Sequence, residues 1–513
     1  MTVEKETKHI NAKRNGDKQM SCTTILVGKD ASYDGSTMIA RNDDSGSGHF
    51  TPKKFVVTQP EDQPKVYKSV ISHVEIELPG NPMRYTCMPN VIEGKGIWGA
   101  AGVNAANVGM TATETITSNP RVLGADPLVK LVEATPDSPE IPGGIGEEDI
   151  VILVLPYIRS AREGVLRLGE LLEKYGTYEM NGIAFSDTKE IWWLETIGGH
   201  HWIAKRVPDN SYVVMPNQQG IDDFDLNDAF GAQKEHLCSR DLMNFIKDNH
   251  LDLSIDDNFS ARAAFGSHDD ADHVYNTPRA WYMLRYLNPR TFKWDGPDAE
   301  FDPQSDDLPW CLIPEKKITP DDVKYVLSSH YQGTKYDPYA AYGNKDMTGA
   351  FRSIGINRND FMALIQLRND APENARAIEW VAYASNAFNT MCPFYANIDE
   401  TPEYLNNTTA EVSTDNFYWN SRLIAALTDA AFGKNQFHIE RYTESVLSKG
   451  YALINKYDAE LKKITDADEA IKKQEEANRE IAEMLRKETA DTLDKVLFEA
   501  SNHMKNQYSR SDA

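Results

Sequence analysis

The order in which strand-like and helical segments follow one another constrains the fold of this chain most. Runs of β-branched and apolar residues bounded by turn residues predict strands at 23–27 and 37–41, which form a hairpin. Apolar residues recur at helical spacing over 147–175, strands return between 182 and 215, and the chain after 384 is mostly helical. The remaining predicted elements are strands at 54–58, 73–78, 96–102, 109–116, 361–367 and 377–384, and helices at 241–250, 278–287 and 320–329. This order predicts an α+β layered fold and not a doubly wound parallel sheet.

The two ends of the chain differ from the part between them. Residues 1–21 are polar and contain no apolar stretch, which predicts a leader before the folded protein that is not a secretory signal. We expect residues 22–435 to form the main domain and 436–513 a helical segment. Apolar residues in that segment recur at roughly helical spacing: Ile464, Ile471, Ile481, Leu485, Leu493 and Leu497. They predict an amphipathic helix packed on its own domain, and the alternative is a dimerising coiled coil, hence a homo-oligomer.

Charge and cysteine usage limit the partners and the compartment. There are 54 Lys and Arg against 78 Asp and Glu, a net charge of −24, which argues against nucleic acid or an anionic membrane surface as a partner. The most apolar run, 150–158, is too short to span a bilayer. The five cysteines are scattered and form no C-x-x-C pair, which argues against a disulfide framework and a zinc site. We therefore expect a soluble protein of the reducing cytoplasm.

Common motifs of phosphate binding, serine hydrolysis and zinc binding are missing from the sequence. It contains no G-x-x-x-x-G-K-[ST], no G-x-S-x-G and no H-E-x-x-H. His200 and His201 are adjacent, so on a strand they point to opposite faces and do not readily share a metal. We expect neither a metal nor an organic cofactor.

Cys22 follows the leader directly and stands at the head of the first predicted strand. If the bond between Ser21 and Cys22 were cut, Cys22 would carry a thiol and a free α-amine, with reference pKa values of about 8.5 and about 8. Such a residue holds nucleophile and general base in one place and needs no histidine. The alternative for a lone cysteine is a small buried apolar side chain.

The residues around Cys22 favour the first interpretation. The stretches Cys22-Thr23-Thr24-Ile25-Leu26-Val27-Gly28, Asp34-Gly35-Ser36-Thr37 and Ala40-Arg41-Asn42-Asp43-Asp44 resemble the start of the bacterial cysteine dipeptidases, the dipeptidase A family. These are N-terminal nucleophile hydrolases related to choloylglycine hydrolases, penicillin V acylases and secernins. The resemblance covers nearly the whole chain after residue 21. It implies a four-layer αββα fold with extra C-terminal helices and a catalytic domain at 22–435. Because Ser21 would block the α-amine even if translation began at Met20, we also predict a cut between Ser21 and Cys22 made by the Cys22 thiol itself.

The resemblance also implies roles for four residues besides Cys22. Arg41 would favour the thiolate through its positive charge, and Asp44 would accept a hydrogen bond from the Cys22 α-ammonium. Asp43 fits the local pattern as well, so the choice of Asp44 rests on spacing alone. Asn217, after a predicted strand, matches the asparagine that supplies an oxyanion-hole amide, and Arg279 matches a further arginine near the thiol. The alternative for Arg41 and Asp44 is a surface ion pair. For Asn217 it is a turn asparagine, and for Arg279 a charge at a helix start.

One position departs from the relatives that act on amides. They carry Asn or Tyr after the second strand of the small-residue hairpin, where this chain has Glu114. An ionised carboxylate cannot donate to an oxyanion, but it can bind the free ammonium group of a substrate. Glu114 is thus a candidate substrate-binding residue. Asn104, in the turn of the same hairpin, is a second candidate, although a plain turn asparagine is the alternative.

Together these observations predict a cysteine-type dipeptidase that works through a thioester at Cys22 and takes dipeptides as substrates. Two alternatives remain open. One is an amidase that acts on non-peptide amides of the bile-salt or penicillin V type. The other is a non-catalytic, secernin-like interaction protein.

Overall fold

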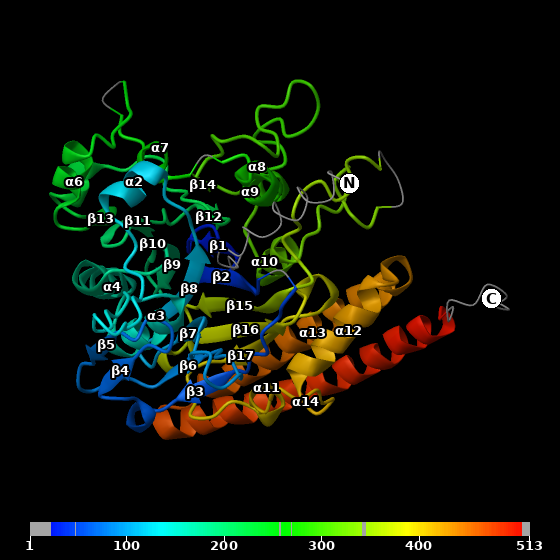
Figure 1. Ribbon diagram of the computed structural model, residues 1–513. Helices are drawn as coiled ribbons and strands as arrows, with labels where there is room; N and C mark the ends of the chain where they lie inside the picture. The colour runs from blue at the N-terminus through cyan, green and yellow to red at the C-terminus, as the bar shows by residue number, and fades with distance from the viewer. Residues whose placement is uncertain (1–21, 47, 256–257, 268, 341–344, 505–513) are drawn as a thin grey trace.

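Two antiparallel sheets lie face to face at the centre of the computed structural model (Figure 1). The structure describes residues 22–46, 48–255, 258–267, 269–340 and 345–504, so the predicted leader lies outside the described residues. The seven-stranded sheet has the order β14 (Cys311–Leu312), β12 (Tyr212–Met215), β1 (Thr23–Val27), β2 (Thr37–Asp44), β15 (Asn359–Leu367), β16 (Ala377–Tyr383) and β17 (Cys392–Tyr395). The six-stranded sheet has the order β13 (His236–Cys238), β11 (His201–Arg206), β10 (Ile191–Ile197), β9 (Asn181–Ser186), β8 (Gly109–Thr115) and β7 (Ala101–Val103).

The predicted hairpin at the start of the folded chain is confirmed. β1 pairs antiparallel with β2, Thr24 opposite Arg41, and the turn between them contains Gly35 at φ +79°. Such a positive φ favours glycine. Every residue of both strands is buried, because β12 and β15 flank the pair and other layers cover both faces. The head of β1 thus lies deep in the molecule.

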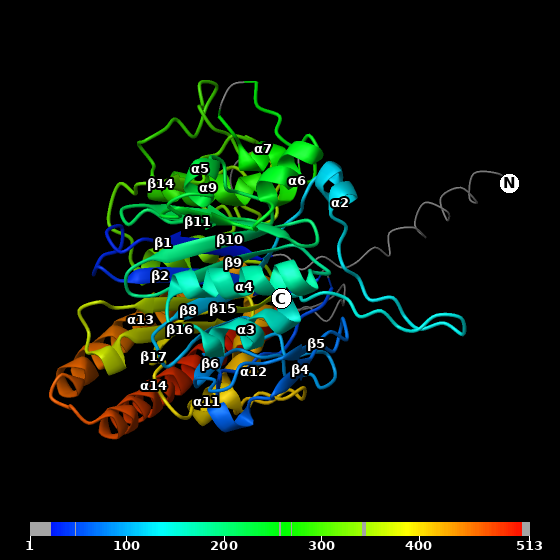
Figure 2. The same cartoon turned by 90° about the vertical axis from the view of Figure 1, so that its left-hand side faces the viewer.

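Helices cover the outer faces of both sheets. α3 (Glu147–Val154) and α4 (Ala161–Tyr175) pack on the six-stranded sheet and stand in front of it in Figure 2. α9 (Thr277–Leu287), α10 (Pro320–Leu327), α12 (Phe417–Asp429), α13 (Phe432–Leu461) and α14 (Ala467–Asn502) pack on the seven-stranded sheet. The predicted α+β class and its αββα layers are confirmed.

Smaller elements complete the fold. Two short hairpins pair β3 (Val56–Thr58) with β6 (Tyr85–Cys87) and β4 (Val66–Lys68) with β5 (Glu75–Glu77). The short helices are α2 (Pro120–Ala125), α5 (Leu226–Ala229), α6 (Leu242–Asp248), α7 (Ala261–Phe265), α8 (Asp272–Tyr275) and α11 (Glu403–Asn406).

Several short elements were not predicted, namely β4, β6, β13, β14, α2, α5, α7 and α8. Two further parts of the core also differ from the sequence prediction. The single helix expected over 147–175 is two helices, because a 3-10 turn over Leu155–Tyr157 contains Pro156 and separates α3 from α4. β17 was not predicted, since Cys392–Tyr395 is a four-residue apolar run without alternation. Its backbone is covered by α14, where Asn478 both donates to and accepts from the backbone of Tyr395.

The C-terminal helices pack on their own chain. Ile481 and Leu485 of α14 are buried in the main core, and α14 contacts α12, α13 and β17. Leu497 is half exposed. The predicted boundary at residue 435 falls inside α13, and the division at that point stays a prediction. No helix in the described part of the chain is long and apolar enough to cross a membrane.

Small residues of the β7–β8 hairpin allow a close approach of two backbones. A Cβ added to Gly102 would lie 1.8 Å from the backbone oxygen of Thr86. Only glycine fits there. This contact fixes the hairpin whose second strand carries Glu114.

Candidate active site

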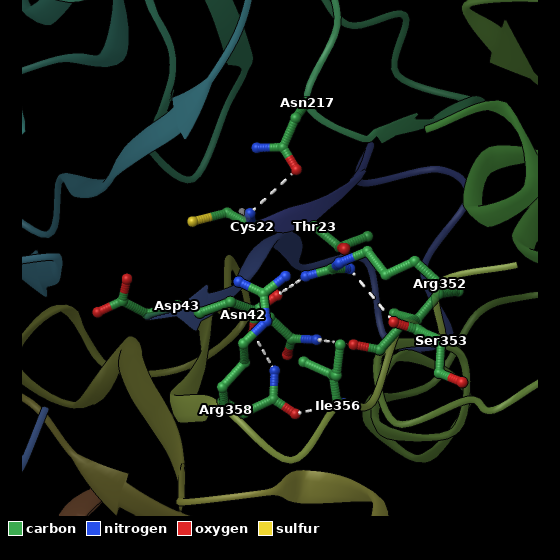
Figure 3. Close-up of polar contacts among 12 residues, drawn as sticks. Cys22, Thr23, Asn42, Asp43, Asn217, Arg352, Ser353, Ile356 and Arg358 are labelled. Atoms are coloured by element: carbon green, nitrogen blue, oxygen red, sulfur yellow. Dashed lines mark hydrogen bonds and ion pairs between the residues drawn. The ribbon is translucent and has the colours of Figure 1, made fainter. Parts of the chain in front are cut away.

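Cys22 lies at the head of β1, between the two sheets, and its side chain is fully buried. Its backbone nitrogen donates to Oδ1 of Asn217 at 3.2 Å, and its sulfur points away from Asn217 on the side of Asp43 (Figure 3). Burial raises the pKa of the thiol well above its ordinary value, opposed by the charge of Arg41. Burial therefore favours the neutral thiol, and one cation is in place to favour its ionisation.

Arg41 supplies that cation from the neighbouring strand. Its Nη2 lies 2.9 Å from the Cys22 Sγ, and its Nη1 donates to the carbonyl oxygen of Ala112 on β8 at 2.7 Å. Burial opposes the guanidinium charge, but Cys22, Glu147 and Asp43 raise the pKa of Arg41 above its ordinary value. A permanent positive charge next to the sulfur is the setting that lowers the pKa of reactive cysteines.

Asn217 and Arg279 hold the other side of Cys22. Arg279 comes from the first turn of α9 and donates to the Cys22 carbonyl oxygen through Nη1 and to Asn217 Oδ1 through Nη2, the latter at 2.6 Å. Asn217 uses one N–H of its amide to bind the Thr115 oxygen at 2.9 Å. Because the amide nitrogen carries two hydrogens, one N–H remains for an oxyanion.

Asp44 makes contacts other than those expected. Its carboxylate accepts from Arg352 and Asn359, whereas the Cys22 nitrogen donates to Asn217. Strand alternation explains the difference, since Arg41 and Asp43 share the face of β2 towards the six-stranded sheet and Asp44 lies on the other face. Asp43 lies 3.1 Å from Arg41 Nη2. The bond from Asp44 to a free Cys22 amine stays a prediction.

Glu114 lies near the thiol and is fully buried on β8. Its Oε2 accepts from the Thr24 hydroxyl at 2.7 Å, and its Oε1 has no hydrogen-bond partner among the described residues. Burial raises the pKa of Glu114 to about 8, with Arg279 and Thr24 opposing. A buried carboxyl oxygen without a partner next to a reactive thiol is suited to bind a polar substrate group.

Asn104 has the contacts of a turn residue. Its Nδ2 donates to the carbonyl oxygens of Leu155 and Ile158, and its Oδ1 accepts from the backbone of Ala106 and Val108. Asn104 lies at the turn end of the hairpin and Glu114 five residues up β8 from Gly109, a separation of about 17 Å at strand rise. The structure does not bring Asn104 to Cys22, and the turn interpretation accounts for its contacts.

Sequence reasoning missed three charged residues around the thiol. Glu147, the first residue of α3, lies 2.5 Å from Arg41 Nη2. Lys53 pairs with Asp43 at 3.1 Å, and Arg352 pairs with Asp44. All three are buried. Glu147 and Lys53 stand beside other charged residues in the sequence, and Arg352 belongs to none of the motifs identified in the sequence. The acidic run that begins at Glu147 is typical of any helix N-terminus, where acidic side chains are favoured.

A cavity of about 650 Å³ begins at Asp43. Asp43 and Lys53 line its polar part, and Phe50, Ile71 and Trp98 line an apolar part. Asp43 also contacts Arg41, so the cavity begins one residue away from the group that touches the Cys22 sulfur. A cavity of about 830 Å³ between α10 and α13 and one of about 620 Å³ beside α9 contain none of these residues.

Comparison with known proteins agrees with this geometry. The model of peptidase family C69 matches residues 21–445. The chain belongs to peptidase family C69. It is 54% identical to "Dipeptidase" of Bifidobacterium longum (strain NCC 2705) over 96% of this chain and 100% of the relative, and 53% identical to "Probable dipeptidase A" of Streptococcus pyogenes serotype M18 over 96% and 99%. It is 42% identical to "Dipeptidase A" of Lactobacillus helveticus over 96% and 100%.

Family C69 membership confirms the predicted family. The part of this C69 peptidase that the structure describes contains no group of three or more His, Cys, Asp or Glu side chains placed to hold a metal ion. What the structure does bring together is a thiol, a guanidinium 2.9 Å from it and an amide that holds the backbone nitrogen of the same cysteine. This arrangement suits nucleophilic attack by sulfur, with the general base supplied by the nitrogen of Cys22 once that nitrogen is an amine.

Proposed function

We propose that this C69 peptidase hydrolyses dipeptides through a thioester at Cys22. One observation carries the proposal: Arg41 contacts the Cys22 sulfur at 2.9 Å while Asn217 holds the nitrogen of the same residue at 3.2 Å. The nucleophile and its base are thus oriented by separate partners. The names of the relatives, dipeptidases at 42–54% identity, support the substrate class, and the family match favours neither alternative.

Maturation must come first, because a peptide nitrogen is not a base. In our proposal the Cys22 sulfur attacks the Ser21 carbonyl carbon, the C–N bond breaks, and the α-amine is released as a thioester forms. Water then hydrolyses the thioester, which leaves a carboxylate on Ser21 and a free thiol on Cys22. Arg279 donates to the Cys22 carbonyl oxygen and keeps the residue in place throughout.

Turnover repeats the same chemistry on a dipeptide. The α-amine of Cys22 takes the thiol proton, and the thiolate attacks the peptide carbonyl carbon. The oxyanion receives the second N–H of Asn217, a type of donor worth about 3–4 kcal/mol. As the C–N bond breaks, the α-ammonium protonates the leaving amine. Water, deprotonated by the α-amine, hydrolyses the thioester.

Glu114 and the cavity at Asp43 support a small substrate with free ends. The unpaired Oε1 of Glu114 can accept from the substrate ammonium group, which would keep the carboxylate ionised. The cavity has a volume of about 650 Å³, which is in the size range of small-molecule sites. This size suits a dipeptide and not a folded protein. We therefore propose that the enzyme prefers substrates with a free N-terminus.

We propose the cytoplasm as its compartment, where all five cysteines, free thiols in the structure, remain reduced. Homo-oligomerisation stays open. A panel of dipeptides, conjugated bile salts and penicillin V tests the function. Release of amino acids from dipeptides alone supports the proposal, whereas hydrolysis of the amides without the dipeptides contradicts it.

A further inference from the structure

Three acceptors converge on one nitrogen of Arg41. Nη2 lies 2.9 Å from the Cys22 sulfur, 3.1 Å from Asp43 Oδ1 and 2.5 Å from Glu147 Oε1. A guanidinium nitrogen of this kind carries two hydrogens, so the thiol competes with two carboxylates for them. The direction in which Arg41 points is therefore set by the acids that hold it.

Glu147 reaches Arg41 from helix α3, which packs on the six-stranded sheet. It is buried at the first position of α3, and Glu179 Oε1 accepts from its backbone nitrogen at 2.6 Å. Its Oε1 also lies 3.4 Å from the Thr113 nitrogen on β8, next to the Ala112 carbonyl that takes Arg41 Nη1. Glu147 is thus fixed at both ends, and it ties the guanidinium to β8.

Asp43 alone cannot hold Arg41 in this way. It lies on the same strand two residues further on and shares its carboxylate with Lys53 at 3.1 Å. Without Glu147, the Ala112 carbonyl would hold only Nη1 at β8, and Asp43 would draw Nη2 towards the cavity and away from the Cys22 sulfur. We propose that Glu147 is a positioning residue that keeps Arg41 directed at the Cys22 sulfur, an inference that rests on Cys22 being the nucleophile of the proposed function.

The position and the charge of Glu147 act on Cys22 in opposite directions. A correctly placed Arg41 lowers the pKa of the thiol, whereas the negative charge of Glu147 raises it. The other charged and titratable groups that interact with Cys22, Arg41 or Glu147 are Asp43, Lys53, Glu114, Glu179, Tyr178, Arg279 and Arg358. All of them are the same in both variants and titrate alongside Cys22 in each, so a difference between the two variants at 147 reports the position and the charge of residue 147.

Two substitutions separate position from charge. Glu147→Gln keeps an oxygen at the same reach and removes the charge, and Glu147→Asp keeps the charge but is one methylene too short to reach Arg41. The readout is the rate at which iodoacetamide alkylates Cys22 as a function of pH, followed by peptide mass spectrometry. This readout needs no peptide substrate, so it is independent of the dipeptidase assay.

We expect the pH midpoint of Cys22 alkylation to fall in Glu147→Gln and to rise by about one unit in Glu147→Asp, which slows alkylation at neutral pH about tenfold. The matched controls are Glu379→Gln and Glu379→Asp, since Glu379 is a buried acid on β16 that accepts from Thr86 and contacts neither Arg41 nor Cys22. They should keep the parent midpoint. A midpoint in Glu147→Asp equal to the parent's, or shifts of both Glu147 variants in one direction, would overturn the proposal. Dipeptide turnover has no influence on either result.

Discussion

Asn217→Asp tests the oxyanion role of Asn217 with little change in shape. In the parent, Oδ1 accepts from the Cys22 nitrogen and from Arg279 Nη2, and Nδ2 donates to the Thr115 oxygen. An aspartate keeps both accepted bonds, and Arg279 balances its charge. It loses every amide N–H, both the one to Thr115 and the one proposed for the oxyanion.

The two losses have different magnitudes and different readouts. The missing bond to Thr115 leaves a buried carbonyl oxygen opposite a carboxylate and costs about 1–3 kcal/mol of unfolding free energy. The missing oxyanion donor costs about 3–4 kcal/mol in the transition state, so kcat should fall about 100-fold to 1000-fold. KM should stay within about threefold, because this bond is made only in the transition state.

The assay is steady-state hydrolysis of a dipeptide by matured enzyme over a range of pH, with thermal unfolding alongside. Comparing variant and parent over the whole pH range separates the loss of the donor from any shift that the new charge causes in the pKa of the thiol. Asn217→Ala is the comparison: because it also loses the accepted bonds, including the one that orients the Cys22 nitrogen, its kcat should fall at least as far as that of Asn217→Asp, with lower thermal stability. A kcat for Asn217→Asp within about threefold of the parent would refute the oxyanion role.

Three further predictions follow from the same site. Activity should survive EDTA and be lost on thiol alkylation, and a loss in EDTA that zinc or manganese restores would point to a metallopeptidase. Cys22→Ser should mature partly or fully, because one slow cleavage suffices, yet lose at least about 100-fold in dipeptide turnover, about 2.7 kcal/mol in barrier. Cys22→Ala should keep its leader and be inactive, as intact mass and a dipeptide assay will show. Burial raises the pKa of Glu114 to about 8. Between pH of about 4.5 and 8 the folded protein therefore holds a proton on Glu114 that the unfolded chain has lost. This acid consequently lowers the free energy of unfolding as pH rises through that range. Glu114→Gln should therefore gain unfolding free energy relative to the parent from pH 5 to 8 in denaturant titrations, where a flat difference contradicts the shift. It should also raise KM about tenfold for free dipeptides and not for N-acetylated ones.

Local sequence patterns were enough to predict most of the layered fold. Alternation and turn residues located β1, β2 and the strands between 181 and 215, because each such segment carries its own turn signals. β17 lacks those signals, and its place at the sheet edge is fixed by Asn478, more than eighty residues away. The break at Pro156 was visible in the sequence but was outweighed there by the helical stripe on either side.

The candidate site was predictable where its residues share one motif. Cys22 and Arg41 stand in the stretch that resembles the cysteine dipeptidases, and the structure brings them into contact. Glu147 carries no such signal, since only the packing of α3 against β8 places it on Arg41. Strand alternation, applied to residues 41–44, indicates that Asp43 and not Asp44 shares the face of Arg41. Matching Asp44 to the Arg-x-x-Asp pattern of the relatives did not take this alternation into account.

The most direct test of the account is mass spectrometry of matured enzyme quenched in acid during turnover of a dipeptide. The account predicts an N-terminal peptide that begins at Cys22 and carries the acyl residue of the substrate on its sulfur. Active enzyme whose N-terminus is not Cys22, or an acyl group attached to any other residue, would contradict it.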